Sequence, residues 1–330
     1  MHVGILTGGG DCPGLNAVIR AVTLALANEA GAAVTGIERG FQGLLTNALR
    51  PLQPDDVVEI LATGGTILGS HNRCNPFDID GADRSADAMA TVRRIGLDAL
   101  VAIGGDGTMD IAHRFEPLGL PVVGVPKTID NDLFHTDRTF GFDSAVAVVA
   151  DSLDRLRTTA KSHGRVMIAE TMGRHAGWIA LEGGMAGGAD AILLPEVPFA
   201  IDALAAFCRE REALGLSTLV CVAEGVHPAG AGAWLQAQLA PKVGCDVRSI
   251  SLGHLQRDGS PTAFDRVLAT RFGYAAAQLV KAGDTGRMVT LKGTDCSSVP
   301  IADVAGRNRL VPPDHALVQA ALGLGVFVGY

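Results

Sequence analysis

The chain of 330 residues is 48% hydrophobic and 19% charged, which excludes intrinsic disorder and fibrous structure and allows a large buried core. Its 27 basic and 35 acidic side chains give a net charge of −8, so we do not expect nucleic acid as a partner. No secretory signal is visible, and no apolar run approaches the ~20 residues of a membrane helix. We therefore expect a cytoplasmic protein with no membrane partner, built from about two domains.

The six cysteines lie far apart in the sequence and form no C-x-x-C motif. This spacing fits neither a disulfide-rich scaffold nor a zinc ribbon. We expect reduced thiols.

Short apolar runs alternate with longer helical patterns along the chain. Strands are expected at residues 3–7, 33–37, 99–103, 121–125, 165–170, 191–195, 219–223 and 288–291. Helices are expected at 13–30, 142–158 and 265–282, where apolar residues recur with helical spacing. The alternation predicts an α/β fold with parallel sheets covered on both faces. No tandem repeat or long polar linker appears, so a second domain would share the chain through crossings.

The first glycine-rich stretch is T-G-G-G-D-C-P-G-L-N at residues 7–16, between the first expected strand and helix. Backbone N–H groups at such a helix start can bind an anion, and the helix dipole favours negative charge there. A plain tight turn is the alternative. The chain has no G-x-G-x-x-G and no G-x-x-x-x-G-K-[ST] motif, which argues against a dinucleotide site and a Walker NTPase.

The second stretch is G-G-D-G-T, formed by Gly104, Gly105, Asp106, Gly107 and Thr108 after the third expected strand. Its glycines leave space for a phosphate chain, and the aspartate is a candidate Mg²⁺ ligand. An aspartate in a glycine turn also has a purely structural interpretation.

The third stretch is P-K-T-I-D-N-D at residues 126–132, after the fourth expected strand. If it is extended, Asp130 and Asp132 project to one side as a candidate base and a second carboxylate. Lys127 and Thr128 add a cation and a hydroxyl for phosphoryl oxygens. A capped turn is the alternative for this loop alone, but all three stretches follow expected strands, which favours a ligand site.

Basic residues follow in the second half of the chain: Arg165, Arg174, Arg248, His254 and Arg257. In an acidic protein this set indicates a receptor for a small phosphorylated substrate. Each one alone has an equally simple interpretation as a solvated or paired surface residue.

These motifs resemble those of the phosphofructokinase family. T-G-G-G-D-C-P-G-L-N, G-G-D-G-T, P-K-T-I-D-N-D, M-G-R and G-H-L-Q-R-D-G-S-P-T-A-F-D-R occur in the family's order and at similar spacing. The likeness runs from residue 3 to about residue 280. G-G-D-G-T also occurs in NAD kinases and diacylglycerol kinases, whereas P-K-T-I-D-N-D combined with G-H-L-Q-R is highly specific.

The resemblance implies two three-layer α/β/α sandwich domains with mainly parallel sheets and an active site in the cleft between them. A donor-binding domain would comprise residues 1–139 and about 253–305. A sugar-phosphate-binding domain would comprise about 140–252 and 306–330.

The resemblance also implies phosphoryl transfer from Mg-ATP to the 1-hydroxyl of fructose 6-phosphate, a reaction of glycolysis. By this likeness Asp130 would be the general base, Asp106 would anchor Mg²⁺, and Asp132 would support the metal or orient the base. The N–H of Gly10, together with Thr128 and Arg174, would stabilise charge on the moving phosphoryl group.

For the donor, the resemblance places Arg73 and the loop from Gly104 to Thr108 along its phosphates. For the sugar, it places Glu224 and the M-G-R motif, in which Gly173 joins Met172 to Arg174, at the hydroxyls and the ring.

The 6-phosphate of the sugar would be held by His254 and Arg257. Arg165 and Arg248 would reach this group from a neighbouring subunit, which implies a homodimer and, by family preference, a homotetramer.

Two positions disagree about the donor. Gly107 leaves room for the α-phosphate of ATP, where pyrophosphate users of the family usually carry aspartate. Lys127 is typical of pyrophosphate users, where ATP-dependent bacterial members usually carry glycine. A carboxylate at position 107 would exclude ATP, whereas a lysine at position 127 need not. ATP is therefore the predicted donor and pyrophosphate the alternative.

Bacterial members of the family bind an allosteric effector through several basic residues between subunits, and we expect this site to be weakened or absent here. Arg20 and Arg157 match two of those basic residues, but Leu24, Pro54 and Gly215 stand where other positive residues are expected.

Two further alternatives remain. A lipid or NAD kinase would not explain the pair His254 and Arg257. A catalytically silent, sugar-phosphate-binding regulatory subunit is disfavoured because Asp130, Asp106 and Arg174 are all present.

Overall fold

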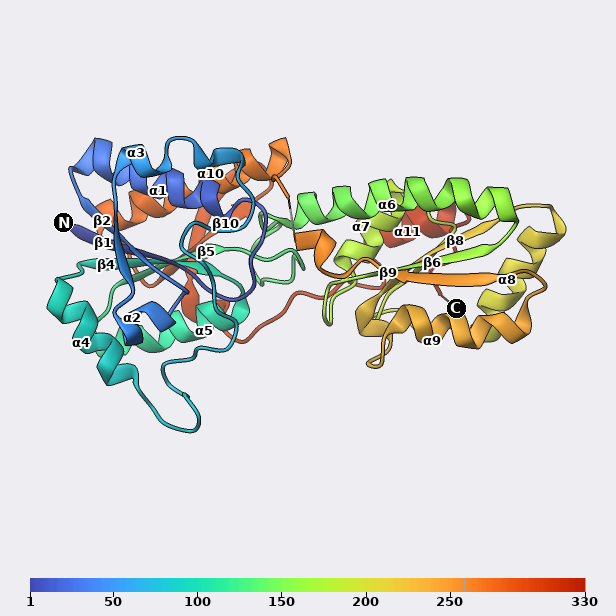
Figure 1. Ribbon diagram of the computed structural model, residues 1–330, viewed down its shortest axis with the longest axis horizontal. Coiled ribbons are helices and arrows are strands. Elements are labelled where there is room, and N and C mark those ends of the chain that lie inside the picture. Colours follow the sequence, from blue (N-terminus) through green and yellow to red (C-terminus); the bar gives the residue numbers. More distant parts are fainter. Residues whose placement is uncertain (258, 330) are drawn as a thin grey trace. The chain divides into compact units, whose positions relative to one another are not determined.

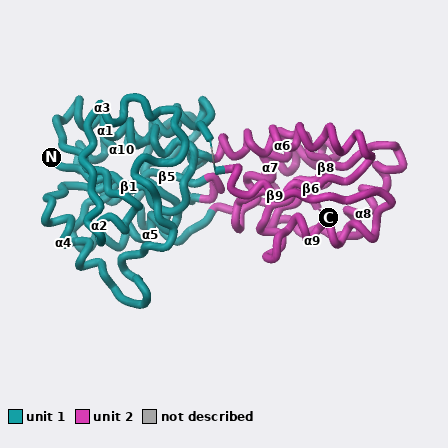
Figure 2. Tube along the Cα trace, viewed as in Figure 1, with its two compact units in different colours: residues 1–128, 133–141, 257–308 teal, residues 129–132, 142–256, 309–330 magenta. Residues whose placement is uncertain are grey.

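The computed structural model describes residues 1–257 and 259–329; Asp258, which belongs to the G-H-L-Q-R-D-G-S stretch, lies outside the described residues. The chain forms two compact units (Figure 2). Unit 1 comprises residues 1–128, 133–141 and 257–308, and unit 2 comprises residues 129–132, 142–256 and 309–330. The P-K-T-I-D-N-D loop is therefore divided, with Lys127 and Thr128 in unit 1 and the two aspartates in unit 2.

The sheet of unit 1 has the order β11-β10-β5-β4-β1-β2-β3. Its inner pairs are parallel, whereas the edge strands β3 and β11 pair antiparallel with their neighbours. The strands are β1 (His2–Thr7), β2 (Ala33–Ile37), β3 (Leu49–Leu52), β4 (Ala99–Gly104), β5 (Val122–Pro126), β10 (Arg287–Lys292) and β11 (Asp295–Pro300).

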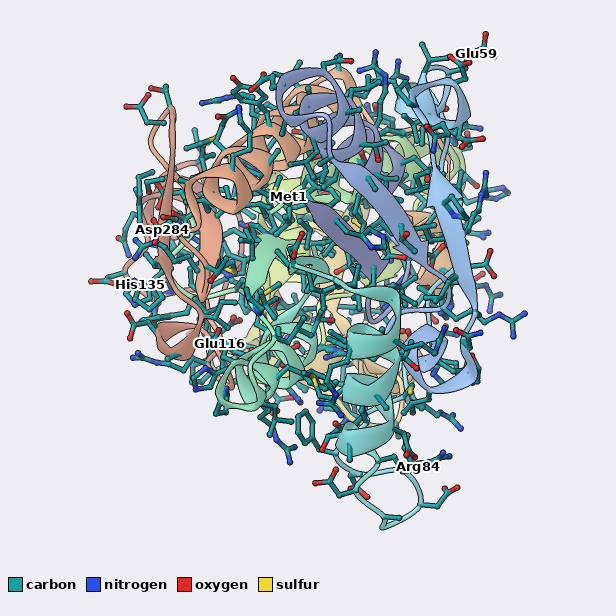
Figure 3. All side chains as sticks on the ribbon, turned by 90° about the vertical axis from the view of Figure 1, so that its left-hand side faces the viewer. Met1, Glu59, Arg84, Glu116, His135 and Asp284 are labelled. Atoms are coloured by element: carbon teal, nitrogen blue, oxygen red, sulfur yellow. The ribbon has the colours of Figure 1, made fainter. Side chains whose placement is uncertain are left out.

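Helices cover both faces of this sheet (Figure 1). On one face lie α1 (Leu15–Ala30), α3 (Pro54–Val57) and α10 (Ala263–Ala282), and on the other α2 (Gln42–Thr46), α4 (Ser85–Ile95) and α5 (Asp106–Phe115). β4 is buried along its whole length because it is central and covered twice. Charged side chains such as Glu59, Arg84 and Asp284 lie at the outer rim of unit 1 (Figure 3).

Unit 2 has a fully parallel sheet of order β7-β8-β6-β9. The strands are β6 (Val166–Thr171), β7 (Ala191–Leu193), β8 (Thr218–Ala223) and β9 (Val247–Ser251). One face carries α6 (Phe142–His163), α7 (Trp178–Ala186) and α11 (Ala316–Gly323), and the other carries α8 (Ile201–Ala213) and α9 (Ala231–Leu239) (Figure 1). Both units are thus three-layer α/β/α sandwiches, as expected.

Short 3-10 helices complete the described structure at Ile60–Ala62, Glu116–Leu118, Glu224–Val226, Ala240–Lys242, Gly253–Arg257 and Ile301–Asp303.

Every expected strand and all three expected helices form, with boundaries shifted by a few residues. Three strands were not predicted: β3, β9 and β11, each at the edge of a sheet. These three strands are only partly buried, so they lack the continuous apolar run of a central strand. No described helix is both long and apolar enough to cross a bilayer.

Candidate active site

The glycine loop after β1 lets a long side chain approach its backbone closely. Gly8 N donates to Ile103 O at 2.8 Å, which places the loop beside the end of β4. A Cβ atom on Gly10 would overlap Nη1 of Arg257, so glycine is required for the observed packing of the arginine against this loop. Both residues belong to unit 1.

The G-G-D-G-T loop begins α5, with Gly105 as its N-cap and Asp106 in its first turn. The side chain of Thr108 is buried against Gly104, where a Cβ atom would overlap the threonine hydroxyl. Gly107 is exposed, and a Cβ atom built on it meets nothing within 4 Å. The loop therefore has open space on the side of Gly107, where the sequence analysis places the α-phosphate of ATP.

Lys127 is only 4% exposed and joins the two glycine loops. Its backbone N–H donates to Gly104 O at 3.0 Å, and its Nζ donates to the carbonyl oxygen of Gly10. The neighbouring Thr128 is held through its carbonyl, which accepts the hydroxyl of Thr139 at 2.7 Å. The lysine charge thus lies at the strand ends where the phosphate donor is expected.

A polar pocket of about 290 Å³ lies beside the first glycine loop, lined by Gly10, Asp11 and the segment from Ser70 to Arg73. The segment that leads into Ser70 is fixed by Asn16, at the start of α1. The Asn16 side chain donates to Thr63 O at 3.0 Å and accepts from Ile67 N at 2.8 Å. Arg73 is exposed at the rim of this pocket, consistent with a role toward an anionic ligand.

The carboxylate loop of unit 2 is buried. Asp130 and Asp132 are 6% and 7% exposed, and Asn131 between them is 2% exposed with φ of 53°. The backbone of this loop is bound by Arg309, whose guanidinium donates to Asn131 O and whose N–H donates to Asp132 O. Sequence analysis missed Arg309, because no local motif marks it.

The M-G-R turn after β6 is bound by Glu224, which follows β8. Oε1 of Glu224 accepts the N–H groups of Gly173 at 3.1 Å and Arg174 at 2.8 Å. Met172 N donates to Oε1 of Gln256, a fully buried residue, at 3.2 Å. The structure thus brings Glu224 and the M-G-R motif together in unit 2.

Arg165 and Arg248 converge on one carboxylate of unit 2. Asp246 Oδ2 lies 3.1 Å from Arg248 Nη2 and 3.8 Å from Arg165 Nη2. The parallel pairing of β6 with β9 explains this, because Arg165 and Arg248 lie at neighbouring strand starts. Asp246 was not among the expected site residues, although it lies two positions before Arg248.

The G-H-L-Q-R motif forms a 3-10 helix, and its two candidate phosphate ligands belong to different units. His254 is exposed in unit 2, whereas Arg257 belongs to unit 1, at the backbone of Gly10. Gln256 between them donates to Gly253 O at 3.0 Å and so closes the turn.

Burial keeps the thiols near this site protonated. Cys12 in the first glycine loop is 1% exposed, and burial raises its pKa well above the ordinary thiol value, outweighing the opposing effect of the Lys127 charge. The six cysteines are all free, as expected. Cys12 therefore packs as an apolar side chain and is a poor nucleophile.

The two arginines expected at an effector site bind groups of their own chain. Arg157 Nη1 lies 2.6 Å from Asp190 Oδ2, and its other nitrogen donates to Gly188 O. Arg211 binds the second oxygen of Asp190 at 2.7 Å. Arg20 Nε donates to Val58 O at 3.2 Å. Arg157 therefore shares one carboxylate with Arg211, whereas Arg20 contacts a neutral carbonyl group.

Among the described residues no group of three or more His, Cys, Asp or Glu side chains could hold a metal ion by itself. Mg²⁺ is commonly bound by one or two carboxylates together with the phosphates of its substrate. Asp106, at the start of α5 beside open space, fits that partial kind of site.

The sequence of the chain is similar to that of known proteins. The family model described as phosphofructokinase matches residues 2–280. The chain is 48% identical to pyrophosphate--fructose 6-phosphate 1-phosphotransferase of Amycolatopsis methanolica, over 96% of this chain and 97% of that protein. It is also 48% identical to the ATP-dependent 6-phosphofructokinase of Chloroflexus aggregans, over 99% of this chain and 98% of that protein.

Solved structures agree with these sequence matches. Pichia pastoris phosphofructokinase in the T-state aligns with a TM-score of 0.82 and 34% identity over 92% of this chain, which spans only 35% of that longer chain. A pyrophosphate-dependent phosphofructokinase from Nitrosospira multiformis, 22% identical, shares the fold with a TM-score of 0.86 over 100% of this chain and 92% of that chain. The chain belongs to the phosphofructokinase family.

Proposed function

We propose that this protein transfers the γ-phosphoryl group of Mg-ATP to the 1-hydroxyl of fructose 6-phosphate, giving fructose 1,6-bisphosphate and ADP. The observation that carries the proposal is the buried loop that presents Asp130 and Asp132 in a member of this family. Asp130 accepts the hydroxyl proton as the oxygen attacks the γ-phosphorus, and the bond from that phosphorus to the β–γ bridging oxygen breaks. Asp132 orients this base or supports the metal.

The donor phosphates lie along the unit 1 loops in this proposal. Gly105 and Thr108 offer backbone N–H groups at the start of α5, where the helix dipole favours anions, and Gly104 precedes them at the end of β4. Arg73, at the rim of the polar pocket, binds the phosphate chain as a cation. Mg²⁺ held by Asp106 and the donor would neutralise phosphate charge.

Charge on the transferred phosphoryl group is stabilised by three groups. These are the N–H of Gly10, the hydroxyl of Thr128 and the guanidinium of Arg174. Phosphoryl transfer needs mainly positioning and electrostatic stabilisation, which such fixed donors supply. Gly10 and Thr128 belong to unit 1, and Arg174 belongs to unit 2.

The sugar phosphate is bound by groups that are mostly in unit 2. Glu224, Met172 and Gly173 contact the hydroxyls and ring, while His254 and Arg257 bind the 6-phosphate. Arg165 and Arg248 bind the same phosphate in a neighbouring subunit, so we propose a homodimer or homotetramer. We expect the protein to act in glycolysis in the cytoplasm.

The donor is the open choice within this function. The open space at Gly107 favours ATP, because the α-phosphate and the nucleoside need that volume. Lys127 donates to the carbonyl of Gly10 and is buried, so it leaves the side of Gly107 open. Pyrophosphate-dependent transfer is the second candidate, favoured by Lys127 itself and by the relative of that name from Amycolatopsis methanolica.

Rates measured with each donor separately test the proposal. Initial rates of fructose 1,6-bisphosphate formation are compared with ATP and with pyrophosphate at matched Mg²⁺ and sugar phosphate. We expect turnover with ATP to exceed that with pyrophosphate. Turnover with pyrophosphate alone would favour the second candidate, and no turnover with either donor would favour a silent binding subunit.

A further inference from the structure

Arg309 lies beyond the residues that the family model matches, yet it binds the backbone between the two carboxylates. Its Nε and Nη2 lie 3.3 and 3.0 Å from the carbonyl oxygen of Asn131. Its own N–H donates to the carbonyl oxygen of Asp132 at 2.6 Å. One residue thus supplies donors to two consecutive carbonyls of the loop, and all these residues belong to unit 2.

Arg309 is itself held by Trp178, the first residue of α7. The guanidinium carbon lies 4.4 Å from the centroid of the indole ring, and the indole Nε1 donates to Arg309 O at 2.9 Å. Trp178 is only 4% exposed, so this cation–π contact is largely shielded from water. Two residues on, Val311 N donates to Glu196 Oε1 at 2.9 Å, and the same oxygen accepts Gly177 N. The segment from 309 to 311 is therefore fixed to the start of α7.

The loop turns at its central residue. Asn131 has φ of 53°, in the left-handed region, which asparagine adopts more readily than most residues with a Cβ atom. Hydrogen bonds from a charged donor are about twice as strong as neutral ones, and the guanidinium directs two of its nitrogens at the Asn131 carbonyl. This arrangement stabilises one conformation of the peptide units that join Asp130 to Asp132.

We propose that Arg309 is a positioning residue for Asp130: it fixes the loop conformation that directs the carboxylate toward the acceptor hydroxyl. The inference rests on the proposed function in that Asp130 is the base. A base displaced by about 1 Å costs on the order of 100-fold in rate. Arg309 therefore acts on the chemical step without contacting substrate.

The test compares Arg309→Met and Arg309→Lys with the matched control Arg307→Met. Arg307 lies two residues before Arg309 and also makes an aromatic contact, since its guanidinium carbon lies 4.2 Å from the centroid of the Phe134 ring. It donates to Asp303 O and not to the carboxylate loop. We expect Arg309→Met to lower kcat roughly 10-fold to 100-fold with both KM values changed less than about 3-fold. Arg309→Lys, which keeps the charge and loses the planar fork, should fall between. Arg307→Met should match the wild type.

A double-mutant cycle with Asp130→Asn separates positioning from general destabilisation. Once the base is absent, Arg309→Met should cost less than about 2-fold further. Equal factors in both backgrounds, or an Arg309→Met enzyme with wild-type kcat, would overturn the proposal. If Arg309→Met does not fold, the same cycle is run with Arg309→Lys, which keeps the positive charge.

Hydrogen exchange tests the inference without using activity. The peptide spanning residues 127–132, which does not contain Phe134, should exchange faster in Arg309→Met than in the wild type, and at the wild-type rate in Arg307→Met. If the wild type turns over neither donor, the proposed function fails while this measurement still decides the role of Arg309 in the loop. Unchanged exchange in Arg309→Met would contradict that role.

Discussion

Glu224 fixes the backbone of Arg174. Its Oε1 accepts the N–H of Arg174 at 2.8 Å, and Arg174 has φ of 51°, a conformation that costs energy for any residue with a Cβ atom. The same oxygen accepts Gly173 N, so both peptide units of the turn are fixed by one carboxylate. The residue proposed to meet the sugar thus also sets the direction of the arginine proposed to stabilise the phosphoryl group.

This relationship predicts different effects for two substitutions of Glu224. Glu224→Ala removes the acceptor and should lower kcat on the order of 10-fold to 100-fold, because Arg174 loses its orientation. Glu224→Gln keeps an oxygen that can accept both N–H groups, so it should retain a larger share of kcat while raising KM for the sugar. Steady-state kinetics of the two variants test this, and equal losses of kcat would contradict the backbone role.

Gly107→Asp should weaken the use of ATP. Nothing lies within 4 Å of the added Cβ, and an acidic residue in the first turn of α5 suits the helix dipole, so the fold should be preserved. The new carboxylate would repel the α-phosphate, and we expect kcat/KM for ATP to fall roughly 100-fold, about 2.7 kcal/mol. Gly107→Asn is the control that adds the same volume without charge. Unchanged ATP kinetics in the aspartate variant would show that the donor runs elsewhere.

Gly10→Ala should displace Arg257. The added methyl group would overlap Nη1 of the arginine, the far end of a flexible side chain, so the fold should survive while the arginine moves. We expect KM for fructose 6-phosphate to rise on the order of 10-fold, by loss of a charged contact. Arg257→Ala should show a similar loss, and adding Gly10→Ala to it should change little. Additive losses would mean that Gly10 acts independently of Arg257.

The free thiols should divide into two groups by reactivity. At pH 8 a small thiol reagent should modify the half-buried Cys74, Cys245 and Cys296, whereas Cys12, Cys208 and Cys221 should react only after unfolding. Burial raises the pKa of Cys208 to about 11 and that of Cys221 to about 12. Mass spectrometry of native and denatured protein counts the modified sites, and rapid native labelling of Cys221 would contradict the described packing.

These raised pKa values also predict a pH dependence of stability. Above the ordinary thiol value of 9.0 the unfolded chain releases thiol protons that the native chain keeps up to about 12 at Cys221. The unfolded state then binds fewer protons, so the free energy of unfolding falls as pH rises through this window. Denaturant unfolding at pH 8 and pH 10.5 measures the fall, which should be smaller in Cys221→Ala than in the wild type.

The central part of the fold could be predicted from the sequence because its signals are local. β4 is an uninterrupted apolar run, and α1 repeats apolar residues at helical spacing, so each element is visible without its neighbours. β9 was missed because its sequence V-R-S-I-S has only two apolar residues, three positions apart, and its edge position leaves much of it exposed. Its place in the sheet depends on pairing with β6, a long-range contact that composition does not reveal.

The residues of the candidate site likewise divide into those that local sequence patterns reveal and those that depend on long-range contacts. Gly104 and Asp130 could be selected because they follow strands, and ligand sites of α/β sheets gather at those ends. Arg309 could not, because it is 178 residues from Asn131 in the sequence and lies in no motif. Asp246 was missed for another reason: a carboxylate beside an arginine resembles an ordinary surface ion pair until Arg165 is seen to share it.

Replacement of Asp130 by asparagine tests the central claim most directly. The variant keeps the volume of the side chain and loses the base, so kcat for fructose 1,6-bisphosphate formation from ATP should fall roughly 10²-fold to 10⁴-fold. Calorimetric titration with fructose 6-phosphate should still give a dissociation constant within about 3-fold of the wild type. Turnover equal to the wild type would show that another group accepts the proton and would contradict this account.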